Sequence, residues 1–223
     1  MKRILILCLF FCSISTASSK IALVIKVNGK AFVIEEANSV KQPLKPGTPL
    51  KDKDKILTEK NGFVAIMYLD DKSVIKMLGN SDLTVSGKRS GTLINKSLDI
   101  KYGKIAASIT PQKGNEFRIA TPTSVASVKG TELTIDSQPG IGDSFTLLEG
   151  LIEVTNTITG ESTEVEIGET VVSTPEGSLE VHETTIDDIA GFELADIEIP
   201  TQEIRFEVED EDGNIKEIII RFE

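Results

Sequence analysis

The most constraining feature of the sequence is the stretch from Phe117 to Asp136, where two short alternating segments flank a run of small residues. Residues 117–120 and 133–135 alternate apolar and polar side chains, as half-buried β-strands do. The small residues 124–128 suit a further strand packed closely against a neighbour. Gly130, in the turn that follows, is predicted to adopt a positive φ or to allow a close backbone approach. Such a stretch requires short strands joined by tight turns.

The composition favours the same class for the rest of the chain. Val, Ile and Thr are frequent, Trp is absent, and aromatic residues make up 5% of the 223 residues. This balance is typical of thin β layers with aliphatic cores. We therefore predict an all-β domain of short strands, built either as a roll or solenoid-like stack or as a sandwich, with a short C-terminal helix and a terminal β-hairpin.

Turn signals divide this domain into strands. Asn28-Gly29 predicts a type I′ hairpin between residues 21–27 and 30–35. Residues 41–54, rich in Pro, Gly and Lys, are expected to form a loop. Gly103, Gly150 and Gly168 each stand between two apolar segments, as the corners of a rolled stack would. Further strands are expected at residues 63–69, 73–78, 82–86, 97–102, 104–109 and 116–120.

The character of the chain changes after Pro175, so we divide it into a β domain (residues 21–175) and an acidic C-terminal extension (residues 176–223). A hydroxyl cap followed by Asp187 and Asp188 predicts a short helix over residues 186–195. A hairpin is expected from Gln202 to Phe222. Its apolar face either docks on the β domain or is covered by a partner, because an isolated hairpin is marginal in water. This possible interaction surface consists of Ile204, Phe206, Val208, Ile218, Ile220 and Phe222.

The N-terminus has the order of a secretory signal peptide. Lys2-Arg3 precede an apolar run from Ile4 to Ile14 and the small residues up to Ala17. A permanent anchor is the weaker alternative, since a spanning helix needs about 20 apolar residues. Lipid attachment to Cys12 is disfavoured by Phe11 before it. We expect cleavage after residue 17, which removes both cysteines, and a periplasmic or secreted mature protein without a membrane span, disulfides or thiol chemistry.

The charge argues against one class of partner. The net charge is −11, and residues 176–223 carry 16 acidic and 3 basic side chains, a net of −13, which leaves +2 for the first 175 residues. Nucleic-acid binding needs clustered Lys and Arg, so it is not expected. The acidic tail is interpreted as a solvated face.

Candidate catalytic and metal-binding residues are few. His182 is the single histidine, so it cannot form a histidine-pair metal site, and it is interpreted as a surface residue. The acidic turn at residues 207–214 offers oxygen ligands for Ca²⁺ but lacks EF-hand spacing, so a plain acidic turn is preferred. Asp70-Asp71 is interpreted as a turn and not as a catalytic carboxylate pair. We predict no catalytic residue, no metal site and no cofactor.

Several motifs together resemble the FecR-type periplasmic domain. Thr121-Pro122, Ala126 and the run from Val128 to Leu133 are similar to the family core, in which Thr121, Pro122, Lys129, Gly130 and Thr131 are the matching motif residues. Residues 50–58, 69–75, 98–105, 145–154 and 165–171 resemble other family segments in the right order. The resemblance covers about residues 24–172. Lys53 and Lys72 stand where the family commonly has Gly, so Asp-containing turns are expected to close both places.

The resemblance implies a function without catalysis. Domains of this family form the periplasmic part of transmembrane regulators that relay a signal from outer-membrane transporters to sigma factors. Here the export signal at Met1 stands where such a regulator has a cytoplasmic region and a spanning helix, so a free-standing module is expected. We expect an exported domain that binds a protein or a cell-envelope polymer in scaffolding or signalling. A secreted carbohydrate-active enzyme is the alternative, and it would need two carboxylates in a cleft.

Overall fold

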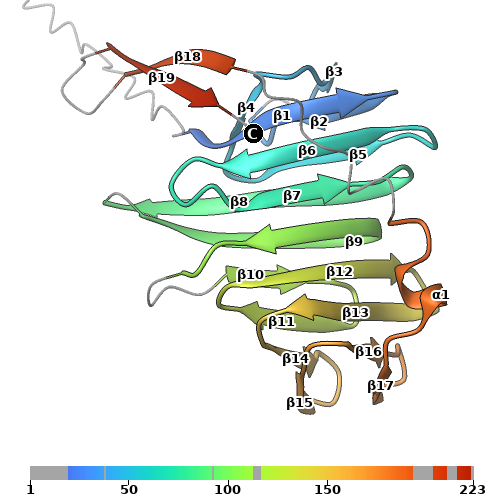
Figure 1. The fold of residues 1–223 in the computed structure, drawn as a ribbon. Helices are drawn as coiled ribbons and strands as arrows, with labels where there is room; N and C mark the ends of the chain where they lie inside the picture. Colours follow the sequence, from blue (N-terminus) through green and yellow to red (C-terminus); the bar gives the residue numbers. More distant parts are fainter. Residues whose placement is uncertain are drawn as a thin grey trace, which may run out of the picture.

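The computed structural model describes residues 20–37, 39–91, 93–112, 117–192, 203–209 and 215–221. Strands β1 to β17 form a continuous 17-stranded arrangement that folds over on itself as two facing layers (Figure 1). The chain passes back and forth between the layers, as a roll does. The all-β prediction is confirmed. The cleavable segment predicted at residues 1–17 lies outside the described residues.

The front layer in Figure 1, called layer A, is antiparallel throughout. Its spatial order is β4 (Pro49–Lys51), β1 (Lys20–Asn28), β6 (Phe63–Tyr68), β7 (Val74–Met77), the second half of β9 (Leu93–Ile109), β12 (Thr131–Gln138), β13 (Gly142–Glu149), β16 (Glu169–Ser173) and β17 (Leu179–Glu183).

Layer B lies behind it and is antiparallel except where β9 pairs with β10. Its order is β3 (Lys41–Pro43), β2 (Ala31–Ile34), β5 (Asp54–Thr58), β8 (Ser81–Ser90), the first half of β9, β10 (Phe117–Ala120), β11 (Ser124–Val128), β14 (Ile152–Asn156) and β15 (Ser162–Val165). The short strands β3 and β4 lie in the segment that was expected to be a loop.

Strand β9 joins the layers. Its residues up to Tyr102 pair with β8, and from Gly103 onward they pair with β12. The two strands predicted at residues 97–102 and 104–109 are therefore two parts of one crossing strand. Gly103 makes the crossing possible, because its φ is +110° and a Cβ there would lie 2.1 Å from the hydroxyl of Ser81.

The interior between the layers is one aliphatic core with three large aromatic side chains. Tyr68, Phe117 and Phe145 are fully buried, and the rings of Tyr68 and Phe117 meet edge to face at 5.4 Å. Phe117 begins β10 and also begins the stretch from Phe117 to Asp136, which most constrains the fold. That stretch supplies β10, β11 and β12, which lie in both layers, so it does connect the two sides of the stack.

The C-terminal part differs from the prediction in two respects. Strand β17 pairs with β16 in layer A, which carries the β domain beyond residue 175. Helix α1 (Ile186–Ile189) is shorter than the predicted helix, because Ala190 is extended and Gly191 has a φ of +86°. Strands β18 (Glu203–Glu209) and β19 (Ile215–Arg221) pair as the predicted hairpin, whose side chains, with all of Phe222, lie outside the described residues. Its docking stays a prediction.

Candidate interaction surface

The residues of the family core motif lie in two turns at opposite ends of β11. Thr121 and Pro122 form the β10–β11 turn, where the Thr121 hydroxyl accepts a hydrogen bond from the Ser124 N–H at 3.1 Å. Lys129 and Gly130 form the β11–β12 turn, and Thr131 begins β12. The motif therefore shapes the two ends of a strand and does not assemble one binding site.

Gly130 has the geometry that was predicted for it. Its φ is +139°, and a Cβ would lie 2.9 Å from the Cα of Pro111. Both features exclude a side chain, because L-residues rarely adopt such a φ and the opposing atom belongs to backbone. The prediction is confirmed, and the role of Gly130 is to let the chain after β9 pass close to the β11–β12 turn.

The two departures from the family pattern also fall at special backbone positions. Lys53 and Lys72 have φ values of +63° and +62°. This is the left-handed region, which the Gly common in the family adopts without steric strain. Neighbouring aspartates support both turns, as predicted. Asp54 accepts a hydrogen bond from the Lys51 N–H at 2.8 Å, and Asp71 accepts one from the Ser73 N–H at 3.0 Å.

The outer face of layer A has a hydrophobic cluster of its own. Along β6, Val64, Ile66 and Tyr68 join the interior core, so the alternate residues point outward. Those outward residues form a second hydrophobic cluster with their neighbours on β1. This cluster, the outer apolar patch, consists of Leu23, Ile25, Phe63, Ala65 and Met67.

The outer face of layer B has a different composition. On the first half of β9, the outward positions include Asn95, Asp99 and Lys101, all exposed. Arg118 on β10 and Glu153 on β14 continue this polar row. A sheet that faces water on one side normally alternates in this way, so layer B has the expected solvent face, whereas layer A departs from it at the outer apolar patch.

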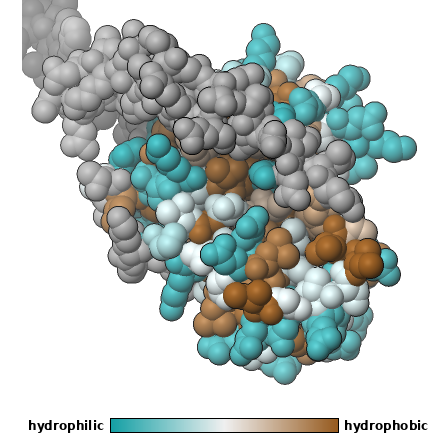
Figure 2. All heavy atoms as spheres, viewed as in Figure 1, coloured by the Kyte–Doolittle hydropathy of each residue, from teal (hydrophilic) through white to brown (hydrophobic). Residues whose placement is uncertain are grey.

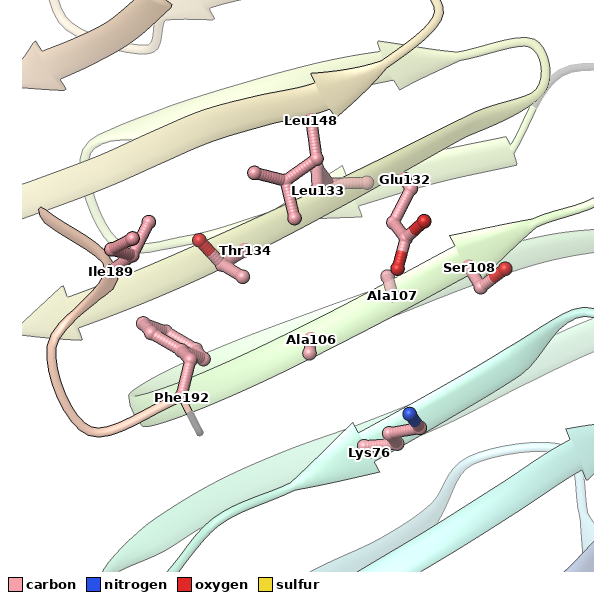
Figure 3. A pocket seen from close by; sticks show the side chains of 10 residues that line it. All are labelled: Lys76, Ala106, Ala107, Ser108, Glu132, Leu133, Thr134, Leu148, Ile189 and Phe192. Atoms are coloured by element: carbon pink, nitrogen blue, oxygen red, sulfur yellow. The ribbon is translucent and has the colours of Figure 1, made fainter. Parts of the chain in front are cut away.

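A groove lies on the same outer face of layer A, beside α1 (Figure 3). Ala106 and Thr134 form its floor, and Leu148, Ile189 and Phe192 surround it. Its volume is about 190 Å³. Pockets for drug-sized ligands occupy roughly 300–1,000 Å³, so this groove suits one or two apolar side chains of a partner. Figure 2 shows the same side of the molecule, with hydrophobic residues gathered between hydrophilic ones.

The groove also offers polar groups. Lys76 from β7 and Glu132 from β12 stand at its rim with opposite charges (Figure 3). The hydroxyl of Thr134 is buried and has no hydrogen-bond partner within the described part of the chain. An occupant could therefore gain a hydrogen bond at the floor, which would satisfy a group that is otherwise costly to bury.

Lys104 holds the segment that forms one wall of the groove. Its Nζ donates a hydrogen bond to the carbonyl of Ala190 at 2.6 Å and lies 5.0 Å from the centre of the Phe192 ring. The same ammonium is 3.5 Å from the carboxylate of Asp136. Phe192 is 6% exposed and packs on Leu78. Residues 190–192 are thus attached to layer A by the main-chain hydrogen bond from Lys104, by the contact of its ammonium with the Phe192 ring, and by the packing of that ring on Leu78.

A charged cluster is buried behind the β6–β7 turn. The ammonium of Lys96 lies 2.8 Å from both Asp70 and Asp71, and Gln112 donates a hydrogen bond to Asp71. We call these four residues the Lys96 cluster. The Lys96 side chain is 2% exposed. Burial raises the pKa of Asp71, but the hydrogen bonds from Lys96, Ser73 and Gln112 outweigh it, so the pKa lies below its usual value.

The arrangement of the Lys96 cluster is structural. Asp70 accepts the N–H of Ile94 at 2.9 Å, which ties the β6–β7 turn to the start of β9. Both carboxylates share one ammonium, and neither faces the groove. Burial and the nearby aspartates raise the pKa of the Tyr68 hydroxyl, so this phenol stays neutral. The interpretation of Asp70-Asp71 as a turn agrees with this geometry.

A second buried polar cluster lies at the β10–β11 turn. Asp143 accepts hydrogen bonds from both the N–H, at 2.8 Å, and the hydroxyl of Thr123. Asn156 donates to the hydroxyl of Ser173 at 2.9 Å, and the Thr123 hydroxyl also contacts the carbonyl of Ser173. We call these four residues the Asp143 cluster. It joins β10–β11 and β14 in layer B to β13 and β16 in layer A.

His182 lies on the surface, as the sequence predicted. Its Nε2 is 3.2 Å from Asp188, and its side chain is 41% exposed. Across the described residues, no group of three or more His, Cys, Asp or Glu side chains is arranged to hold a metal ion. Of the acidic turn at residues 207–214 that was weighed as a Ca²⁺ site, residues 210–214 lie outside that range. Within the same range, no helix is long and apolar enough to cross a membrane.

The sequence predicted the hairpin surface but missed the groove. Leu148 interrupts the alternation of β13 by following the core residue Leu147, and this break was a usable signal. Phe192 stands alone after Gly191, and nothing in the local pattern ties it to Leu78 or Lys104. Only the packing of residues far apart in the sequence brings these groups together.

Taken together, these features define an all-β, two-layer domain with an apolar outer face on one layer. Residues 54–153 match the family model described as FecR protein, so the resemblance seen in the sequence is confirmed. The matched range runs from the start of β5 into β14 and includes both turns of the core motif.

The fold is similar to two crystal structures of a protein described as an anti-sigma factor from Parabacteroides distasonis, at 2.50 and 1.65 Å resolution. Both are 12% identical to this chain, with TM-scores of 0.52 and 0.51. The alignments cover 68% of this chain and 66% of theirs, so this chain spans just under two thirds of those proteins. At this identity the similarity concerns the fold. No curated protein sequence matches the chain.

Proposed function

We propose that this protein is an exported, non-catalytic FecR-type domain that binds a protein partner in a signalling or regulatory assembly. The observation that carries the proposal is the groove on the outer face of layer A, with Leu148 43% exposed and Ile189 39% exposed at its edge. Exposed apolar side chains around a small hollow are typical of protein-binding surfaces. The similarity to a protein described as an anti-sigma factor supports the regulatory part of the proposal.

The groove does not favour the alternative of a sugar-acting enzyme. Such an enzyme needs two carboxylates across the scissile bond, about 5 to 9.5 Å apart. Among the residues that line the groove, Glu132 is the single carboxylate. The paired carboxylates Asp70 and Asp71 share a buried ammonium instead. A binding role therefore fits this surface better than glycoside hydrolysis.

A pull-down with matched variants tests the proposal. The tagged mature protein, its Leu148→Glu variant and its Ile158→Glu variant are incubated with envelope extract. Ile158 is 62% exposed in the β14–β15 turn, away from the groove, and serves as the control. We expect one partner protein to be retained by the wild type and the control and lost with Leu148→Glu. Equal retention by all three, or retention of a polysaccharide only, would contradict the proposal.

Export is tested separately. The order of charged, apolar and small residues up to Ala17 supports cleavage there. Mass spectrometry of the protein recovered from the producing cells should give a chain that begins at Ser18. An intact Met1, or a lipid on Cys12, would remove the exported, unanchored form from the proposal.

A further inference from the structure

The outer apolar patch is buried although it faces away from the interior. Leu23, Ile25, Phe63, Ala65 and Met67 are 1–7% exposed. Leu69 and Val74 pack against them, and the cluster draws its members only from β1, β6, β7 and the β6–β7 turn among the side chains that the structure describes. A sheet face of this size needs a cover, because apolar side chains in water forgo about 25 cal/mol for each Å² left unburied.

The chain that follows α1 leads to this patch. Phe192 packs on Leu78, just past the end of β7, and on Ala106 of β9, both on the outer face of layer A. From β9 the next strands in this layer are β7, β6 and β1, each about 4.8 Å further on. Residues 193–202 connect Phe192 to β18, and a linker of this length reaches at most about 35 to 40 Å. The hairpin can therefore lie on the patch without strain in the connection.

The register of the hairpin gives it one apolar face. Ile204 is paired with Ile220, and Phe206 with Ile218, and directly paired residues share a face of a hairpin. Glu203, Arg205 and Glu207 occupy the alternate positions on β18. The sequence and this register thus give the hairpin one apolar side, and the described side chains that form the patch come from β1, β6, β7 and the β6–β7 turn.

We propose that the outer apolar patch is the docking site of the C-terminal hairpin β18–β19 of the same chain. The face with Ile204, Phe206, Ile218 and Ile220 covers β1 and β6, and the charged face with Arg205 and Glu207 remains toward solvent. The hairpin then forms a third layer over one end of the stack. It leaves the groove beside α1 open, so this inference does not depend on the proposed function.

Cysteine cross-linking tests the docking in the full mature chain. The chain from Ser18 onward has no native cysteine, because Cys8 and Cys12 both precede it. Cysteines introduced as Met67→Cys and Ile218→Cys should be joined within one chain by a short bismaleimide. The matched control is Met67→Cys with Ile219→Cys, since Ile219 occupies the opposite face by register. It should cross-link at least several-fold less. A cross-linked dimer would show that a second copy covers the patch, and no cross-link, or equal yields from both pairs, would also overturn the proposal.

Melting temperatures give an independent measurement. Phe206→Asp should lower the melting temperature by about 10 °C or more, because it places a charge against the patch and releases a whole layer. Arg205→Asp, on the charged face, should leave it within about 2 °C. Equal melting temperatures for the two variants would mean that the hairpin is an independent appendage.

Discussion

Two buried polar clusters connect the layers of the stack, and they satisfy their carboxylates in different ways. In the Lys96 cluster, one ammonium lies 2.8 Å from two carboxylates. In the Asp143 cluster, the carboxylate accepts hydrogen bonds from the N–H and the hydroxyl of Thr123. A buried charge can be retained by an opposite charge or by several aligned donors. In the Lys96 cluster, stability therefore depends on every charged residue. In the Asp143 cluster, it depends on several weaker hydrogen-bond donors.

The largest effect is expected from Lys96→Met. The substitution keeps most of the length of the side chain but leaves Asp70 and Asp71 buried without their cation, which should cost about 3–5 kcal/mol of unfolding free energy. Lys30→Met is the control, because Lys30 lies 3.8 Å from Glu59 and both side chains are exposed, 77% and 49%. That loss should stay below about 1 kcal/mol. Urea unfolding measures both.

A combined variant checks the cause of this loss. Asp70→Asn and Asp71→Asn in the Lys96→Met background remove the unpaired charges and should restore much of the stability. If Lys96→Met costs no more than Lys30→Met, or if the combined variant is no more stable than Lys96→Met alone, the cluster does not stabilise the stack through its charges.

The Asp143 cluster should respond less strongly to the loss of one donor. Thr123→Val keeps the shape and the main-chain donor of residue 123 but removes the hydroxyl, at a cost of about 1–3 kcal/mol. Thr155→Val removes the exposed hydroxyl that contacts Ser162 at 2.8 Å, and it should change stability by less than about 0.5 kcal/mol. A Thr123→Val loss as large as that of Lys96→Met would erase the distinction between the two clusters.

Much of the fold could be predicted from the sequence, because the signals are local. The alternation of residues 117–120 and the positive φ of Gly130 each act through neighbouring backbone, and the structure confirms them. The hairpin predicted at Asn28-Gly29 is wrong. The turn is present, but it passes the chain from layer A to layer B, where β1 pairs with β4 and β6 and β2 pairs with β3 and β5. Asp70-Asp71 was correctly interpreted as a turn. Its cation could not be predicted, because Lys96 is 25 residues away from Asp71 and approaches it only after β8 and β9 are paired. The groove was missed for the same reason, since α1, β9 and β12 form it together.

The pH dependence of stability tests the Lys96 cluster through Asp71. The folded pKa of Asp71 lies below its unfolded value of about 3.9. Its contribution to stability is therefore fully present above the unfolded pKa and is lost as pH falls through the folded pKa. Unfolding free energies measured from pH 5.5 down to about pH 3 should fall less steeply for Asp71→Asn than for the wild type.

Asp54 provides a control of opposite sign. Burial raises the pKa of Asp54, so its contribution is fully present below the unfolded pKa and is lost as pH rises through the folded pKa. Asp54→Asn should therefore make the fall in stability toward acid steeper. If Asp71→Asn and Asp54→Asn shift the profile in the same direction, the opposite shifts assigned to the two carboxylates are wrong.

The smallest effect concerns the turn that carries the Lys96 cluster, and it separates backbone geometry from charge. Lys72 lies between Asp71 and Ser73 with a φ of +62° and an exposed side chain. The left-handed conformation costs an L-residue about 1–2 kcal/mol, whereas Gly loses about 0.5–1 kcal/mol more backbone entropy on folding. Lys72→Gly should thus raise the unfolding free energy by about 0.5 kcal/mol. Lys45→Gly, at an exposed turn position without positive φ, should lower it by a similar amount. A similar loss of stability in both variants would contradict this. It would mean that the hydrogen bond from the Ser73 N–H to Asp71 already compensates for the left-handed conformation of Lys72. The charged cluster alone would then determine the stability of this turn.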